Sequence, residues 1–288
     1  MFVIIGGIVV TLSVIGGFIL AGGHPGALLQ IAEFVVICGC AGGALVIMAP
    51  KKVFVDLVRL IALSFKGAAH SRSAYEELLK ALYELFLLGR RNGMIALEEH
   101  VMNPEQSSVF TKYPSFIHNR AAVRFLCGAL RPIIDGKIKP DQLKFLLETE
   151  MHQAEEEDHA PIGVLTKIAD AMPGFGIVAA VLGIIITMAS IGGPPDQIGH
   201  HVAAALVGTF LGILISYGFL NPLATNIEIS CASHHAYQKT IALSVMGFAN
   251  GMAPIMAVEV ARRGLSSEVK PTAEELEAML KAITAGGK

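Results

Sequence analysis

The sequence predicts an all-α membrane protein with four transmembrane helices, a large helical cytoplasmic insertion between the second and third, and cytoplasmic N- and C-termini. Apolar residues make up 53% of the 288-residue chain and mean hydropathy is +0.59. Only 16% of the residues are charged, against roughly 25% in soluble domains. The apolar residues gather into stretches close to the roughly 20 residues that a membrane helix needs. The net charge of −2 gives no support to nucleic-acid binding.

Residues 1–50 are expected to form a transmembrane hairpin. Residues 1–20 are apolar throughout and lack the positively charged start of a cleaved signal peptide, so they are expected to remain as the first span. A glycine-rich turn follows, and the second span covers residues 27–49. Pro50 and the two lysines after it end this span, in which Glu33 is the only acid.

Residues 51–167 have the composition of a soluble helical domain. Ser73 and Glu76 have the spacing of a capping box, which predicts the start of a helix. A later helix is expected to begin at Asp141 and to end in the acidic run 155–158.

Residues 168–224 are expected to hold the third and fourth spans, and residues 225–288 a cytoplasmic helical tail. Thr272 and Glu275 have the spacing of a second capping box. The final helix that they predict has one apolar face, made of Leu276, Met279, Leu280 and Ile283.

The positions of lysine and arginine predict the orientation. Residues 51–167 contain 16 of these side chains and the tail after Pro222 contains 6, while the short turns 21–26 and 192–201 contain none. Because cytoplasmic loops carry the excess of positive charge, the termini and the large insertion are expected inside and the two short turns outside.

The third and fourth spans carry small residues at helical spacing. They are Gly176, Ala180, Gly183 and Thr187 in the third span and Ala205, Gly208, Thr209, Gly212 and Ser216 in the fourth. In lipid such faces allow another helix to approach closely, so the pair is expected to pack against a partner. Neither 172–191 nor 202–222 contains Asp, Glu, Lys, Arg or His. Proteins that move protons place such groups inside the membrane, so a partner would have to supply one.

Two prolines and two threonines are the candidate coupling and proton-path residues of this pair. Pro173 could serve only to begin a helix, whereas Pro222 would remove the backbone bond to the Gly218 carbonyl and bend a helix that continues. Thr187 lies about 21 Å from Pro173 and Thr209 about 20 Å from Pro222, so the threonines are expected to be nearly level. Alternatively, each hydroxyl bonds a carbonyl of its own helix.

The remaining polar clusters give no support to an enzyme. Arg90 and Glu98 flank a glycine turn and have the ordinary interpretation of a solvated helix end. The acidic run 155–158, with His152 and His159 beside it, matches no metal-ligand pattern. The sequence contains no phosphate-binding loop and no nucleophile elbow. We therefore expect no metal site, no cofactor and no catalytic residues.

Three segments resemble the MotA family of flagellar motor stator subunits, within the wider MotA/TolQ/ExbB proton-channel family. They are NGMIALEEHVMNPEQSSVF (92–110), PGFGIVAAVLGI (173–184) and ALVGTFLGILISYGFLNPLAT (205–225). The stretch GGHPGALLQIAEFVVI after the first span is also similar. The resemblance covers nearly the whole chain in order and spacing.

The resemblance implies a multi-pass protein of the bacterial inner membrane that serves motility and chemotaxis. Members form a ring, a pentamer, around two copies of the single-span partner MotB, which supplies a titrating aspartate. Protons are the transported ion, and their flow generates torque on the rotor. The resemblance places the coupling prolines at Pro173 and Pro222 and the ion-path threonine at Thr209. Sodium-driven relatives carry threonine where this chain has Ala180, which favours protons.

The resemblance also implies a rotor-facing surface. Arg90 and Glu98 correspond to the charges that pair with opposite charges on the rotor protein FliG. Two other functions remain open at this point. A TolQ- or ExbB-like energising subunit has three spans and an outward N-terminus, unlike the four spans expected here. A membrane transporter acting alone would need its own polar site, for which Glu33, Thr187 and Thr209 are the candidates.

Overall fold

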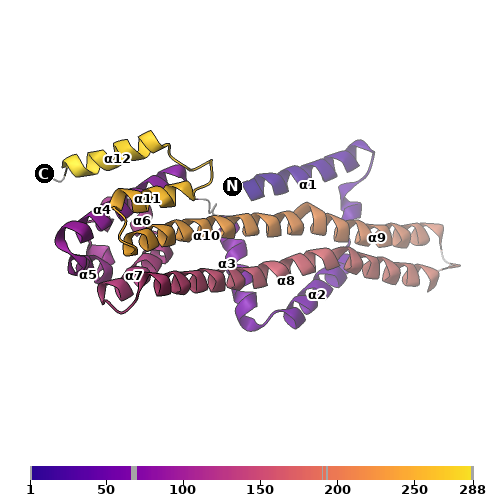
Figure 1. The fold of residues 1–288 in the computed structure, drawn as a ribbon. Coiled ribbons are helices and arrows are strands. Elements are labelled where there is room, and N and C mark those ends of the chain that lie inside the picture. Colours follow the sequence, from indigo (N-terminus) through magenta and orange to yellow (C-terminus); the bar gives the residue numbers. More distant parts are fainter. Residues whose placement is uncertain (1, 66–69, 190, 193, 287–288) are drawn as a thin grey trace. The chain divides into compact units, whose positions relative to one another are not determined.

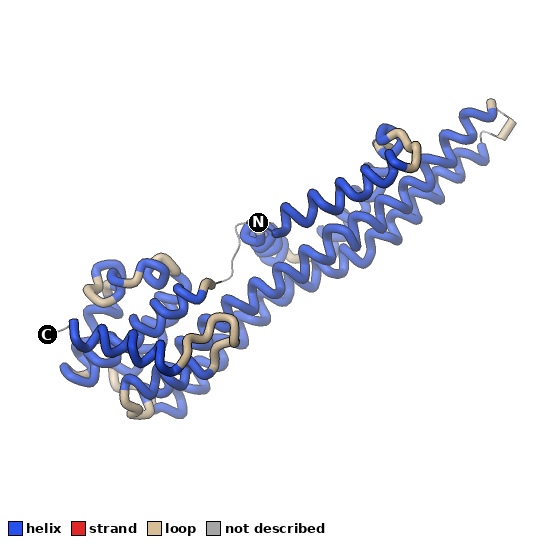
Figure 2. The backbone as a smooth tube through the Cα atoms, turned by 90° about the horizontal axis from the view of Figure 1, so that it is seen from above, coloured by secondary structure: helices blue, strands red, loops and turns tan. Residues whose placement is uncertain are grey.

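The structure is a computed structural model, and it describes residues 2–65, 70–189, 191–192 and 194–286. These residues form helices joined by loops, and no strand occurs among them (Figures 1 and 2). The chain divides into two compact units. We call residues 1–68 with 156–231 the membrane unit, and residues 69–155 with 232–288 the globular unit.

The membrane unit is built from long apolar helices. Its elements are α1 (Phe2–Leu20), η1 (Pro25–Leu28), α2 (Ile31–Met48), α3 (Lys51–Ser64), the later part of α8 (Pro140–Ala189), α9 (Pro195–Ile213), η5 (Leu214–Leu220) and the start of α10 (Asn221–Ala249). Four helical stretches of the described chain are long and apolar enough to cross a membrane. They begin at Phe2, Pro25, Pro140 and Pro195, which confirms the four predicted apolar spans.

Helix α8 is longer than the sequence analysis predicts. The helix expected to end in the acidic run 155–158 continues without a break to Ala189 and has 50 residues. Glutamate is a good helix former, so the run itself does not stop the helix, and Pro161 is accommodated inside it. The run is also partly neutralised, because Lys52 Nζ lies 3.0 Å from the Glu157 carboxylate.

The fourth span continues past Pro222, as predicted. Helix α9 passes into a π-helical segment, η5, and then into α10, which begins at Asn221. Pro222 has no N–H to give to a carbonyl one turn back. The seven-residue π segment, which ends two positions before it at Leu220, changes the helical hydrogen-bond pattern. The backbone irregularity therefore lies before the proline.

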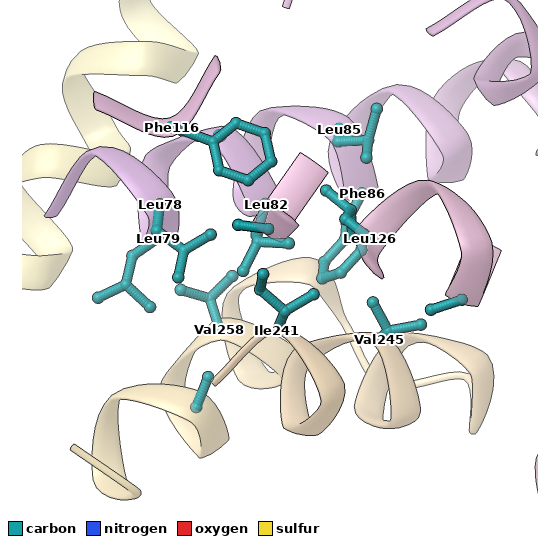
Figure 3. Close-up of a cluster of buried hydrophobic side chains, with 14 of the residues drawn as sticks. Leu78, Leu79, Leu82, Leu85, Phe86, Phe116, Leu126, Ile241, Val245 and Val258 are labelled. Carbon is teal, nitrogen blue, oxygen red and sulfur yellow. The ribbon is translucent and has the colours of Figure 1, made fainter. Parts of the chain in front are cut away.

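The globular unit contains the remaining helices. They are α4 (Arg72–Asn92), η2 (Met94–Leu97), α5 (Glu98–Met102), η3 (Pro104–Gln106), η4 (Phe110–Lys112), α6 (Pro114–Ile117), α7 (Arg120–Ile134), the start of α8, the end of α10, α11 (Pro254–Arg263) and α12 (Ala273–Gly286). Figure 3 shows the core, in which Leu82 of α4 lies near Ile241 of α10 and Val258 of α11. Segments far apart in the sequence thus share one hydrophobic core.

The start of α4 differs from the prediction. The helix begins at Arg72, and the N-cap is Ser71, whose side chain accepts a hydrogen bond from the Ala74 N–H at 3.2 Å. The predicted capping box of Ser73 and Glu76 is wrong. Glu76 instead pairs with Arg72 Nε at 3.1 Å, so this carboxylate is engaged one turn into the helix.

The predicted capping box of the last helix is confirmed. The Glu275 N–H donates to Thr272 Oγ1 at 3.1 Å, and the Thr272 N–H donates to the Glu275 carboxylate at 2.6 Å. The same carboxylate accepts from the Arg72 guanidinium at 2.5 Å. This contact joins the start of α12 to the start of α4. Leu276 and Leu280 are buried on the predicted apolar face.

A largely buried cluster of charged side chains on α11 connects this helix to the loop before α12. Glu259 accepts from Arg262 at 2.7 Å and from Arg263 at 2.8 Å. Arg262 also donates to the Pro271 carbonyl at 2.9 Å. These hydrogen bonds from Arg262, with the smaller contribution of Arg263, lower the pKa of the Glu259 carboxyl from 4.5 to about 2.

We expect Glu259→Gln to destabilise the globular unit by about 2 kcal/mol, since it removes charge-assisted hydrogen bonds from Arg262. In the unchanged protein this stabilisation is complete above pH 4.5 and is lost as the pH falls towards 2. Thermal unfolding of the detergent-solubilised chain, followed by circular dichroism across this pH range, measures both effects.

Glu277→Gln is the matched control. Glu277 pairs with Lys281 at 2.7 Å, but its side chain is 57% exposed, so its loss should have little effect. Equal unfolding midpoints for the two variants at neutral pH would contradict the role given to Glu259.

Candidate functional site

Helices α8 and α9 lie against each other backbone to backbone. A Cβ atom on Gly176 would lie 2.7 Å from the Gly208 carbonyl oxygen, and one on Gly212 would lie 2.7 Å from the Met172 carbonyl oxygen. Such distances leave no room for a side chain. The sequence analysis assigns these small residues to a partner, but in the structure the glycine faces pack against each other within one chain. These glycines are therefore occupied by the neighbouring helix of the same chain.

Glu33 of α2 is buried beside this contact. Its side chain is 6% exposed, and its Oε2 would lie 2.6 Å from a Cβ on Gly208. Within the described part of the chain, Oε2 has no hydrogen-bond partner. Ile37, one turn further along α2, is completely buried in the same unit. The sequence identifies Glu33 as the only acid in a predicted span, but it does not show that Glu33 packs against α9.

The candidate residues of α8 lie one heptad apart. Pro173 and Ala180 are half-buried, and Thr187 is buried. The Thr187 hydroxyl donates to the Gly183 carbonyl of its own helix at 2.8 Å. This is the alternative that the sequence analysis leaves open for Thr187, and it means that this hydroxyl already has a partner within α8.

Thr209 behaves differently. Its Cα would lie 3.3 Å from a Cβ on Gly176, and its side chain is half-buried. Among the described residues, its hydroxyl forms no hydrogen bond. Of the two threonines, Thr209 thus has the hydroxyl that is available to water or to another chain.

The predicted alignment of the two threonines is wrong. Thr209 lies level with Gly176, whereas Thr187 is eleven residues further along α8, about 16 Å away. The prediction assumed that the two prolines share one depth. Pro173 instead follows Met172, which is in contact with Gly212, while Pro222 lies ten residues beyond Gly212. Pro173 and Pro222 therefore lie at different levels of the helix pair, and the fourth span reaches Pro222 as part of a helix that continues past it.

A polar group lies next to Pro222. Asn221 Nδ2 lies 3.4 Å from Asp170 Oδ1 and 3.5 Å from Ser216 Oγ. Ser216 is completely buried in the π segment. Sequence reasoning missed Asp170, although it is a charged residue three positions before Pro173 at the edge of an apolar stretch. These contacts connect α8 to the helix that carries Pro222.

In the globular unit, Arg90 and Glu98 lie on either side of a tight turn. Gly93 makes this turn with a φ of 85°, a conformation that glycine adopts without strain. A Cβ on Gly89 would lie 2.9 Å from Leu97, so the residues directly before Arg90 and Glu98 are in contact. Both charged side chains are exposed, and neither forms an ion pair with another described residue.

These features define a class of protein: a helical membrane protein with four candidate spans, whose central stretches 172–191 and 202–222 contain no Asp, Glu, Lys, Arg or His. Two family models match the chain. Motility protein A N-terminal matches residues 4–93, and the MotA/TolQ/ExbB proton channel family matches residues 118–235. The chain belongs to the MotA/TolQ/ExbB proton channel family, in its motility protein A branch.

Relatives and solved structures agree with this assignment. Motility protein A of Salmonella typhimurium is 36% identical over 98% of this chain and 96% of its own length. Motility protein A of Escherichia coli is 34% identical with the same coverage. The fold is similar to that in a structure of C. jejuni MotAB, with a TM-score of 0.78, 21% identity, and coverage of 92% of this chain and 96% of the other.

A second structure has the same fold. It is the flagellar MotAB stator complex from Bacillus subtilis, with a TM-score of 0.75 and 24% identity. The similarity covers 96% of this chain and 98% of that chain.

We expect Gly212→Ala to separate α8 from α9, because the new methyl group would meet the Met172 carbonyl and the Gly176 backbone, neither of which can turn away. Overpacking of this kind costs about 1–3 kcal/mol. The thermal midpoint of the detergent-solubilised protein, read by fluorescence size-exclusion chromatography, should therefore fall.

Gly174→Ala is the control, since nothing lies within 4 Å of a Cβ at that position of α8. Equal falls of the thermal midpoint in both variants would contradict the role of the helix contact, because they would show that replacing any glycine of the pair destabilises the protein.

Proposed function

We propose that this chain is a stator subunit of a bacterial flagellar motor that conducts protons together with a partner and converts their flow into torque on the rotor. One observation carries the proposal: the closely packed α8–α9 pair and the π segment after it have no Asp, Glu, Lys, Arg or His in residues 172–191 or 202–222. A proton path needs a titrating group, so a second chain must bring it. Relatives named motility protein A support the same role.

The partner proposed here is a MotB-like subunit with one span and an intramembrane aspartate. The solved structures with this fold are MotAB complexes, which favours such an assembly. We extend the proposal to a pentameric ring of this chain, in contact with lipid, in the bacterial inner membrane. The distribution of lysine and arginine supports cytoplasmic termini and a cytoplasmic insertion. No enzymatic step and no cofactor is part of this function.

Within the membrane unit, Thr209 is the proposed proton-path hydroxyl, because it has no partner in the described chain. Ala180 and Pro173, half-buried on α8, would face the partner span. Thr187 is the weaker candidate, since its hydroxyl is bonded to Gly183. Pro222, the second residue of α10 after the π segment, is the proposed hinge that transmits a change at the path to the rest of α10.

In the globular unit, the exposed Arg90 and Glu98 are the proposed rotor contacts, with FliG as the rotor protein. Complementary charges on two surfaces set the register and the rate of association more than the affinity. The absence of ion pairs at both side chains within the described chain favours this role over a purely structural one.

The two other functions are less well supported. A TolQ- or ExbB-like subunit has three spans, and this chain has four candidate spans. A transporter acting alone has one specific observation in its favour, the buried carboxylate of Glu33 without a partner at Oε2. A lone transporter would lose transport on the change Glu33→Gln, whereas a stator subunit would lose only some of its assembly.

Acidification of the cytoplasm tests the proposed function. We expect cells that contain this chain and a MotB-like partner without its periplasmic plug to acidify, because the partner completes the proton path. A pH-sensitive fluorescent protein measures the rate. Replacing the partner's aspartate with asparagine should reduce acidification to the background of cells that lack this chain.

Acidification by this chain alone would contradict a shared path. In that case Glu33→Gln in the lone chain should stop the flow, and the transporter function would replace the stator.

A charge reversal tests the rotor contact. Arg90→Glu should severely reduce swimming speed, because like charges brought together at an interface cost several kcal/mol. A compensating reversal on the rotor protein should restore part of the speed. The control is Lys144→Glu, at an exposed position of α8. If Arg90→Glu gives the same swimming speed with the unchanged rotor protein and with the reversed one, Arg90 is only part of a solvated helix end.

A further inference from the structure

Helix α7 presents three arginines along one side. Arg120, Arg124 and Arg131 fall within about 40° of one another around the helix, and they span about 16 Å along its axis. All three side chains are exposed, and α7 contains no acidic residue. Among the residues that the structure describes, none of the three guanidinium groups forms an ion pair.

These arginines line a groove of about 580 Å³ in the globular unit. The opposite wall comes from α5 and η3, and apolar side chains of Val101, Ile117 and Val123 contribute to the lining. The Arg131 guanidinium lies 2.6 Å from the Met102 sulfur, an uncharged partner. Only one acid, Glu105, lines the groove, so its positive charge is largely unbalanced.

Helix stability does not explain the arrangement. Arg120 is the first residue of α7 and Arg124 lies one turn later, where a positive charge is opposed by the helix dipole at a cost of about 0.3–1 kcal/mol. The other face of α7 is held by buried Leu126 and Leu130 in the core. Helix α7 is thus packed firmly in the core but carries a charge pattern on its outer face that does not stabilise it. Such a pattern indicates that the arginines bind another molecule.

We propose that this groove binds an acidic helix of a partner protein. Such a helix would place carboxylates at i, i+4 and i+11, or at i, i+7 and i+11 in the opposite direction, against the three arginines. Its apolar residues would contact Val101, Ile117 and Val123, as in other complexes in which a helix lies in a groove. Arg90 and Glu98 do not line the groove, so this surface is separate from the proposed rotor contact.

The spacing of the charges selects this occupant. A single phosphate or diphosphate group cannot reach guanidinium groups spread over about 16 Å. A second copy of this chain does not fit either, because no two acidic residues in the sequence are four positions apart. None of its helices can therefore match Arg120 and Arg124 together with Arg131.

Binding of a designed peptide tests the proposal. The protein is the full chain in nanodiscs of phosphatidylcholine, which carries no net charge. The probe is a fluorescent helical peptide with glutamates at i, i+4 and i+11 and leucines on the same face. We expect saturable binding, read by fluorescence anisotropy, that weakens as salt is added. Arg124→Gln should weaken binding about tenfold, as expected for a central contact of an interface.

Two controls accompany the probe. Lys281→Gln, at a side chain on α12 that is 74% exposed, should leave the affinity unchanged. A peptide of the same composition with its glutamates distributed around the helix should bind about tenfold more weakly. If Arg124→Gln impairs folding, as judged by circular dichroism, Arg120→Gln takes its place.

Two results would overturn the proposal. The first is equal binding of the two peptides, which would show attraction to charge without recognition of a helix. The second is inorganic polyphosphate that binds more tightly than the peptide and is equally weakened by Arg124→Gln, which would assign the groove to phosphate polymers.

Discussion

The contact between α8 and α9 is the constraint on which the membrane unit depends. Gly176, Gly208 and Gly212 bring two backbones together at distances where no side chain fits. In lipid this packing replaces the hydrophobic effect as the force that joins helices. The contact sets the register of the pair and thereby decides which residues are level with Thr209. It also occupies the glycine faces inside one chain, while Pro173 and Ala180 of α8 stay half-buried.

Much of the architecture can be predicted from the sequence, because membrane spans depend on length and apolar composition. The four spans, the continuation past Pro222 and the cap at Thr272 required no tertiary information. Register between helices did require it. The sequence shows small residues on α8 and α9, but it does not show how far one helix is shifted along the other. The prediction that Thr187 lies level with Thr209 was therefore wrong. The start of α4 was also predicted at the wrong residue, because Ser71 and not Ser73 caps the helix in the structure.

The candidate site could be predicted in its residue types more than in its geometry. The absence of Asp, Glu, Lys, Arg and His from residues 172–191 and 202–222 is visible in the sequence, and so is the charged turn that carries Arg90. Burial of Glu33 against Gly208 is not visible there, because it requires a neighbouring helix to be placed. The three arginines on one side of α7 could have been found from their helical spacing. The groove beside them could not, because α5 and η3 form its opposite wall.

The core of the globular unit also has a consequence for synthesis. Leu82 and its neighbours on α4 leave the ribosome roughly 160 residues before Ile241, with which they are buried. At ordinary translation rates this delay is roughly ten to thirty seconds. During that time an apolar helix face is exposed while later segments enter the membrane. The unit cannot complete its fold until the last span has been made, so a nascent chain is most vulnerable to aggregation or capture by chaperones in this interval.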